Sequence, residues 1–368
     1  MTSAATSVRA ESASTGQSAF AQMQARLAVL GAAFGLVREA PEMLATYRAI
    51  FRHALAFPLG SRPPGTSRLT EDGTPIQFAT TVAAGRPGLR FVGDAGPPGA
   101  SGAERMRTAR AAMAEAAEIL GLSSELATLT PFLDELAPQT DRALMNDPAG
   151  SYWIGAAFAP GAAPLLRLYL NGGWGGQAAV SARLRTFAAH FGQQAAWAEA
   201  EHLIPAALAP LGLAFTLLPG RPARGAIYLR AFGLRLTDYT RLAEAIAGPA
   251  NAAELHAFGT ALLGSDSSHP TPSAVFSIGF SDAPRLSAEL EFCTHCLYRD
   301  DAEACHRLLA LFTAAGLDPT PYLTLLRQLS PGARPGSPPR LHSFVGVDAK
   351  ATGPAYTLYL KPDFATSG

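Results

Sequence analysis

Three segments of the sequence repeat one arrangement of polar side chains. In residues 165–171, leucine alternates with Arg167, Tyr169 and Asn171. Alternation with a period of two is typical of a β-strand, so these three side chains are expected on one face and the leucines on the other. An arginine and a tyrosine on the same face indicate a polar interior, because the outside of a half-buried strand more often carries small or flexible polar groups.

Two later segments carry the same pattern. One places Arg224, Tyr228 and Arg230 on one face, and the other places Tyr359 beside Lys361. A single strand of this kind most often has a solvated face. Three strands with the same design favour a barrel whose lumen is charged and whose outer face is apolar and covered by helices. The cations and phenols would then converge on one site.

The rest of the sequence predicts the elements that must hold this site. Hydrophobic periodicity indicates a fivefold repeat of two helices followed by two strands. Helices are expected over residues 18–30 and 41–54, 103–120 and 123–136, 177–191 and 195–208, 237–247 and 251–263, and 301–315 and 318–329. Strands are expected over residues 75–81 and 88–93, 151–158 and 165–171, 213–218 and 224–230, 273–280 and 287–295, and 341–347 and 356–361. Ten strands in consecutive hairpins close without edges and leave a lumen that can hold a ligand, so the expected fold is α+β, a ten-stranded antiparallel β-barrel of five ααββ repeats with the helices outside.

Composition argues against several classes of protein. The chain has 368 residues, of which 48% are hydrophobic, and its 29 basic residues balance its 29 acidic residues. This is enough for a large core, and the zero net charge gives no reason to expect a nucleic-acid or membrane partner.

High alanine, glycine, proline and arginine content with few lysines is typical of a GC-rich, bacterial genome.

No targeting or membrane-spanning segment is expected. Residues 1–17 are rich in serine, alanine and threonine without a hydrophobic signal core, and the sequence has no apolar run long enough to span a bilayer. We expect a disordered N-terminus over residues 1–17, a single domain over residues 18–368 and a cytoplasmic location. The sequence leaves monomer and homodimer open.

With this order of elements, the sequence resembles aromatic prenyltransferases of the dimethylallyltryptophan synthase type, which have the ααββ barrel fold. The resemblance runs from about residue 67 to residue 361. Its segments are residues 67–77, 89–91, 166–169, 224–228, 289–292 and 356–361. Each segment alone is weakly specific, and their order within a fivefold repeat carries the resemblance.

The resemblance implies a reaction and a set of residues. The family moves an allylic prenyl group, typically dimethylallyl, from its diphosphate to an electron-rich aromatic acceptor, typically an indole such as tryptophan, in secondary metabolism and without magnesium or another cofactor. The partners are then small-molecule substrates. Basic and tyrosine positions expected to hold the diphosphate are Arg90, Arg167, Tyr169, Arg224, Tyr228, Arg230, Tyr359 and Lys361.

Such a reaction needs these residue types. Ionising an allylic diphosphate separates a carbocation from a highly charged anion, so fixed cations must stabilise the leaving group. The planar guanidinium of arginine binds two phosphate oxygens at once and stays charged. Phenol rings stabilise the carbocation by cation–π attraction, and a lumen without bulk water protects it from hydrolysis.

Four positions depart from the family pattern. Gln77 stands where the family has a glutamate that accepts the indole N–H, and Ala226 stands at a cationic position. Glu289 and Glu291 replace residues that are usually basic, amide or tyrosine. These two carboxylates could bind a substrate amine, accept the proton of the arenium intermediate, or form structural ion pairs with the arginines. Gln77, Glu289 and Glu291 are the candidate catalytic residues.

A zinc site is a further candidate. Cys293, His295 and Cys296 lie close in sequence, and Cys305 and His306 follow on the next expected helix. This spacing is not one of the common paired Cys-x-x-Cys forms, and the expected strand places Cys293 and His295 away from the helical pair. A buried or lumen-lining thiol is favoured over a ligand, and no metal is expected.

Two other motifs have ordinary structural explanations. Asp300 and Asp301 resemble part of a magnesium–diphosphate motif, but they stand at a helix start, where aspartate is a common cap. The glycine-rich residues 172–176 could cradle a phosphate, but they lack the lysine and spacing of known phosphate loops, so a tight turn near the barrel rim is favoured.

A function without catalysis is the alternative. The losses at Gln77 and Ala226, with the added carboxylates, would also suit a barrel that only binds a hydrophobic or anionic small molecule. A carrier of a neutral lipid has no use for four or more cations in its lumen. The prenyltransferase hypothesis is therefore preferred.

Overall fold

The structure is a computed structural model, and it describes residues 18–59, 67, 69–85, 87–137, 152–264, 273–283, 285–330, 341–350 and 353–364. The expected disordered segment, residues 1–17, lies outside these ranges. That residues 18–368 form a single domain stays a prediction.

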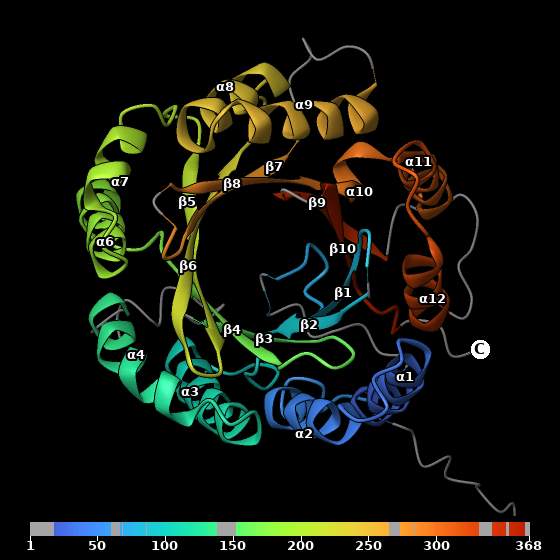
Figure 1. Ribbon diagram of the computed structural model, residues 1–368. Coiled ribbons are helices and arrows are strands. Elements are labelled where there is room, and N and C mark those ends of the chain that lie inside the picture. Colours follow the sequence, from blue (N-terminus) through green and yellow to red (C-terminus); the bar gives the residue numbers. More distant parts are fainter. Residues whose placement is uncertain are drawn as a thin grey trace, which may run out of the picture.

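Ten antiparallel strands form a closed barrel, which confirms the expected fold (Figure 1). They are β1 (Ile76–Val82), β2 (Leu89–Gly93), β3 (Tyr152–Phe158), β4 (Leu165–Asn171), β5 (Ala209–Leu218), β6 (Arg221–Ala231), β7 (Ala274–Phe280), β8 (Ser287–Cys293), β9 (His342–Lys350) and β10 (Gly353–Leu360). Each strand pairs with its neighbour in sequence, and β1 pairs with β10, for example Ala79 with Tyr359. The pairing of first and last strands removes both sheet edges.

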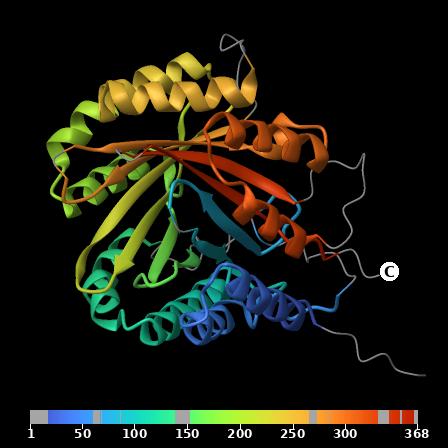
Figure 2. The same cartoon turned by 45° about the vertical axis from the view of Figure 1, so that its right-hand side comes forward.

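Helices surround the barrel in five pairs (Figures 1 and 2). They are α1 (Ala19–Ala33) and α2 (Ala40–Phe51), α3 (Gly102–Ile119) and α4 (Ser123–Leu136), α6 (Gly176–His190) and α7 (Gln194–Glu201), α8 (Leu236–Ala247) and α9 (Pro249–Leu263), and α11 (Asp301–Ala314) and α12 (Thr320–Leu329), with the short α10 (Thr294–Leu297) before α11. No helix among the described residues is both long and apolar enough to cross a bilayer.

The hydrophobic core lies between the barrel and the helices. In β4, Leu166, Leu168 and Leu170 are buried against the outer layer, while Arg167 and Tyr169 alternate with them as the sequence predicts. On another side, the ring of Phe91 in β2 meets that of Phe51 in α2 edge-on, with centroids 5.8 Å apart. Burying such a side chain contributes about 1.5–3 kcal/mol, so the packing of outer faces on helices holds the barrel closed and leaves its inner faces available for polar groups.

Several predicted boundaries are wrong. The strand expected over residues 287–295 ends at Cys293, and Thr294 begins the helical turn α10. The helix expected over residues 195–208 ends at Glu201, and β5 begins at Ala209 rather than at residue 213. Pro205 follows the end of α7, and the residue before a proline is disfavoured in a helix, which gives a physical reason for the shorter helix.

Candidate functional site

The barrel lumen contains a cavity of about 350 Å³. Every strand contributes to its wall, through Gln77, Val92, Trp153, Tyr169, Gly212, Tyr228, Val275, Glu291, Phe344 and Tyr359. A smaller cavity of about 70 Å³ shares Val92, Tyr169 and Tyr359 with the larger one and adds Arg90 and Arg167. The period-two alternation of the sequence therefore brings polar residues from distant segments to one enclosed space.

Arg167 stands between the phenols of this space. Its Nη2 donates to the hydroxyl of Tyr228 over 2.5 Å. Its guanidinium carbon lies 5.3 Å from the ring centroid of Tyr169 and 5.9 Å from that of Tyr228. Burial alone would lower the pKa of Arg167, but the facing phenol groups raise it well above its ordinary value. The arginine therefore keeps a fixed positive charge in the lumen.

Two lumen arginines have donors that the described part of the chain does not use. The buried Nε of Arg167 and the buried Nε of Arg230 have no hydrogen-bond partner among the described residues. Arg230 also borders the larger cavity, and its Nη2 donates to Ser273 Oγ over 3.3 Å. An unsatisfied buried donor costs about 1–3 kcal/mol, more for a charged group, so these atoms are available to an anionic ligand.

Glu291 is the carboxyl that borders the larger cavity. Burial, and then the neighbouring carboxylate of Glu289, raise its pKa to about 7, against the lowering effects of Arg167 and of a hydrogen bond from Tyr359. A Cβ atom on Gly346 would lie 2.7 Å from Cγ of Glu291, so the glycine makes room for this side chain. A carboxyl with a pKa near neutrality can exchange a proton at physiological pH.

Glu289 lies two residues before Glu291 in β8, on the same face of the strand. The Oγ of Ser277 donates to Oε2 of Glu289 over 3.4 Å. Its charge also acts on Arg167. Both carboxylates therefore lie close enough to Arg167 to interact with its charge. Glu291 borders the larger cavity, whereas Glu289 borders neither cavity.

Lys361 is buried at the mouth of the barrel with its charge already paired. Its side chain is 2% exposed, and Nζ lies 2.8 Å from Oδ2 of Asp72 and also contacts Oε1 of Glu71. Both carboxylates come from the segment before β1. Any anion that binds Lys361 must therefore replace these carboxylates.

The remaining predicted residues occupy different depths. Gln77 borders the larger cavity, and its Nε2 donates weakly to the carbonyl of Leu69 over 3.5 Å. Arg90 borders the smaller cavity. Arg224 is exposed and borders neither cavity, although Thr216, its pairing partner in β5, borders the smaller one. The structure thus brings Arg90, Arg167 and Arg230 to the cavities and leaves Arg224 apart.

One wall of the lumen is apolar. Ala214, Ala226 and Val275 form a small buried cluster with Tyr228, and Tyr169, Leu211 and Phe344 pack against it. The alanine that replaces a cation of the family pattern, Ala226, therefore extends an apolar surface. This wall can accommodate a hydrocarbon chain or an aromatic ring.

Some lining residues were missed by the sequence analysis. Trp153 and Phe344 border the larger cavity, and the alternation within their strands would have placed them on the lumen face. Glu71 and Asp72 lie within residues 67–77 of the resemblance, and no local pattern predicts their pairing with Lys361, which lies nearly three hundred residues away.

Both ordinary structural explanations are supported by the observed contacts. Asp300 caps α11, where its side chain accepts from the backbone N of Glu303 over 2.8 Å. In the glycine-rich turn, Arg183 of α6 stacks 3.9 Å from the Trp174 ring and donates to the carbonyl of Gly172 over 2.5 Å. The turn is thus held by its own chain, and Gly175 adopts the left-handed backbone, with φ of 89°.

Solved structures share this fold. No protein-family model and no curated protein sequence matches the chain. The 5-dimethylallyltryptophan synthase from Streptomyces coelicolor superposes with a TM-score of 0.78 at 22% identity, over 96% of this chain and 100% of that chain. The 6-dimethylallyltryptophan synthase from Micromonospora olivasterospora, in complex with DMASPP and Trp, superposes with a TM-score of 0.78 at 23% identity, over 94% and 98%.

A fungal protein is similar at lower identity. AnaPT from Neosartorya fischeri has a TM-score of 0.71 at 14% identity, over 94% of this chain and 95% of that chain. The barrel, the order of its hairpins and its coverage thus agree with the resemblance seen in the sequence. The chain has the ααββ barrel fold of the dimethylallyltryptophan synthase type of prenyltransferase.

Proposed function

We propose that this protein is an aromatic prenyltransferase that moves an allylic prenyl group, dimethylallyl, from its diphosphate to an electron-rich aromatic acceptor of the indole or tryptophan class. The observation that carries the proposal is Arg167, a buried guanidinium held against the phenols of Tyr169 and Tyr228 with its Nε unpaired among the described residues. This arrangement offers a charge for the leaving diphosphate and aromatic faces for the carbocation in the same place.

The first step breaks the bond between the allylic carbon and the diphosphate oxygen. The electron pair leaves with the diphosphate, which Arg90, Arg167 and Arg230 would hold from the cavity walls. The allylic cation remains in the cavity beside the rings of Tyr169 and Tyr228, which contact each other with their centroids 6.0 Å apart. Tyr359 borders both cavities and completes the phenol wall. Because water would react with the cation, the enclosed lumen favours transfer to the acceptor over hydrolysis.

The second step forms the bond to the acceptor. A ring atom of the acceptor attacks the allylic carbon, and the resulting arenium ion loses a proton to restore aromaticity. Glu291 is suited to accept that proton, since its pKa of about 7 leaves it ionised in a substantial fraction of molecules at neutral pH. Gln77 borders the same cavity and can accept an indole N–H bond without a charge, and Glu289 is placed to orient a substrate amine or balance Arg167.

Lys361 joins the diphosphate site only after an exchange of partners. Asp72 and Glu71 hold its Nζ in the absence of ligand, and a diphosphate that reaches the mouth would take their place. Arg224 is not needed in this scheme, since it lies exposed and outside both cavities. No metal ion is assigned to the reaction, and turnover is expected without added magnesium.

Mass spectrometry of products tests the proposal. The protein is incubated with dimethylallyl or geranyl diphosphate and a panel of indoles, tryptophan peptides and phenols, with magnesium either omitted or added. A mass gain of one prenyl unit on an acceptor is expected without magnesium. Diphosphate binding without any product would support the alternative, a barrel that only binds an anionic or hydrophobic molecule, and absence of diphosphate binding would contradict the assignment of the lumen arginines.

A further inference from the structure

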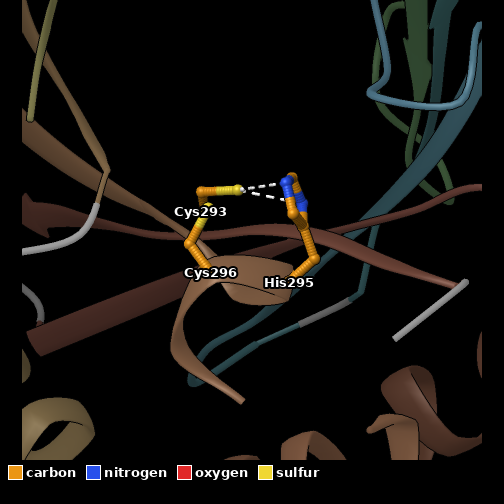
Figure 3. A group of neighbouring side chains, drawn as sticks. All are labelled: Cys293, His295 and Cys296. Carbon is orange, nitrogen blue, oxygen red and sulfur yellow. Dashed lines mark hydrogen bonds between the residues drawn. The ribbon is translucent and has the colours of Figure 1, made fainter. Parts of the chain in front are cut away.

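A cluster of sulfur and nitrogen atoms lies at the mouth of the barrel, outside the residues that border the cavities. The Sγ atoms of Cys293 and Cys296 and the imidazole nitrogen of His295 all lie within 4.8 Å of one another (Figure 3). The sequence argued against a ligand set because it placed Cys293 and His295 along an extended strand. The strand ends at Cys293 instead, and the turn α10 brings Cys296 back toward it.

The backbone holds this cluster in place. The N–H of Cys293 donates to the carbonyl of Ser273 over 3.2 Å, which ties the end of β8 to the start of β7. The N–H of Tyr298 donates to the carbonyl of Thr294 over 3.0 Å and closes the turn that carries His295 and Cys296. The ligand atoms therefore do not depend on a long flexible loop.

The ligand atoms lie closer together than they would around a tetrahedral ion. Sγ of Cys293 lies 2.9 Å from Nδ1 and 3.3 Å from Nε2 of His295. Around Zn²⁺, with bonds of about 2.3 Å to sulfur and 2.0 Å to nitrogen, tetrahedral ligand atoms are about 3.6 Å apart, so a small outward shift of the imidazole accommodates the ion. Two thiolates and one imidazole select a soft or borderline cation over magnesium.

A carboxylate lies beside the cluster without belonging to the three groups whose ligand atoms all lie within 4.8 Å of one another. Oε2 of Glu71 lies 3.7 Å from Nδ1 of His295. Two thiolates balance the charge of a divalent ion, so the site needs no further anion, and water can supply the fourth ligand. Glu71 contacts the ammonium of Lys361, which is also paired with Asp72. Cys296 is exposed, so an ion can enter from solvent on its side. Cys293 is buried and shields the ion on the side of the protein interior.

We propose that Cys293, His295 and Cys296 form a binding site for a thiophilic divalent cation, Zn²⁺, with water as the fourth ligand. Binding releases the protons of the two thiols to solvent, since thiolates are the ligands. The ion joins the end of β8 to the turn α10. The third cysteine, Cys305, stands outside the cluster.

Titration with Zn²⁺ alone tests this site. The full chain, freshly reduced and kept without oxygen, is titrated in competition with a chromophoric chelator, and the metal is counted by mass spectrometry of the native protein. We expect one Zn²⁺ per chain. The variants Cys296→Ser and His295→Ala should weaken binding by about 100-fold or more, because each removes one ligand. Cys305→Ser is the matched control and should bind as the parent does.

Replacement of Zn²⁺ by Co²⁺ allows the thiolate ligands to be detected by absorption spectroscopy. Thiolate-to-cobalt charge-transfer absorption is expected, and Cys296→Ser should lose about half of its intensity, since one of two thiolates is gone. Zinc should also raise the melting temperature of the parent and not that of Cys296→Ser, which separates binding from a general effect on folding.

Three results would overturn the proposal. They are the absence of stoichiometric Zn²⁺ binding by the reduced parent, binding by Cys296→Ser as tight as that of the parent, and loss of binding in Cys305→Ser alone. A metal-free protein that is two hydrogens lighter even after reduction would mean a disulfide between Cys293 and Cys296, and would overturn it as well.

Discussion

Two buried arginines in this molecule have opposite surroundings. Arg105 of α3 is 2% exposed, its Nη1 donates to Oδ2 of Asp94 over 2.5 Å, and two backbone carbonyls accept from its other nitrogens at 3.3 Å. Arg167 in the lumen donates to the hydroxyl of Tyr228, and its Nε has no partner among the described residues. The first guanidinium is saturated by its own chain, whereas the second keeps a donor available.

This difference separates a structural charge from a functional one. Removing Arg105 leaves the carboxylate of Asp94 buried without its cation, and burial already raises the pKa of that carboxyl. Removing Arg167 leaves phenols, which are neutral in this site because burial raises their pKa values, and the carboxyls of Glu289 and Glu291. Burial raises the pKa of Glu291 to about 7, so that carboxyl can take up a proton when the guanidinium is lost. The same substitution should therefore act on stability at one position and on ligand binding at the other.

The substitution Arg105→Met should have the largest effect. Breaking a buried ion pair by removing one partner costs about 3–5 kcal/mol, so the free energy of unfolding should fall by that amount in a urea titration. Arg110→Met, on the same helix, is the control. Arg110 pairs with Asp134 at the surface, with both side chains more than 40% exposed, and exposed pairs contribute about 0–1 kcal/mol. Equal losses in the two variants would remove the contrast.

The substitution Arg167→Met should lower kcat/KM for the prenyl donor by about 10²–10³-fold, the usual cost of losing one preorganised donor at a developing charge. Its free energy of unfolding should stay the same or rise, because an unsatisfied buried donor is removed. Arg224→Met is the matched control, and we expect its kinetics to match the parent, since Arg224 is exposed and borders neither cavity. Destabilisation of Arg167→Met as large as that of Arg105→Met would make Arg167 a structural residue.

The substitution Glu291→Gln should lower kcat by about 10²-fold if Glu291 accepts the proton of the arenium ion. The parent should lose activity as pH falls below about 7, where the carboxyl becomes protonated, and this acidic limb should be absent in the variant. A parent whose activity rises as pH falls below 7 would contradict the role as a base.

Stability offers an independent check on the same group. The folded state holds the proton of Glu291 up to about pH 7, whereas the unfolded chain releases it near 4.5. The folded state therefore binds more protons within this window, and stability should fall as pH rises through it. Glu291→Gln should lessen that fall in chemical denaturation at several pH values.

The substitution Gly346→Ala should have the smallest effect, about a tenfold loss of kcat, because the new Cβ would stand 2.7 Å from Cγ of Glu291 and displace the carboxyl. The double variant Gly346→Ala with Glu291→Gln separates this cause from others. If the alanine acts through Glu291, it should have little further effect on kcat once the carboxyl is gone. Additive losses would show another cause.

The sequence predicted the barrel because its signal is local. Alternation of Arg167 and Tyr169 with leucines fixes which side of β4 faces inward, and the outer faces are mostly apolar, with Thr80 and Ser343 as exceptions. Alternation does not determine how deep in the barrel a lumen-facing side chain lies. Arg224 and Arg230 share a face of β6, yet they stand at opposite ends of the strand, so one is exposed and the other borders the cavity.

Contacts between distant segments escaped the sequence analysis. The pairing of Lys361 with Glu71 and Asp72 depends on β10 lying beside β1, and no local pattern encodes it. The end of β8 at Cys293 also escaped, because a four-residue helical turn is too short to show helical periodicity. Which charges are paired at this end of the barrel therefore became clear only from the structure.

The pairing of β1 with β10 also bears on the order in which the protein can fold. The first strand has no partner on one side until the last hairpin has been synthesised, so four-fifths of the barrel emerges from the ribosome with two open edges. Contacts of such long sequence separation slow folding and leave edges that can pair with other chains. Losing β10 should therefore reduce soluble yield far more than losing any one surface contact, because it reopens the sheet.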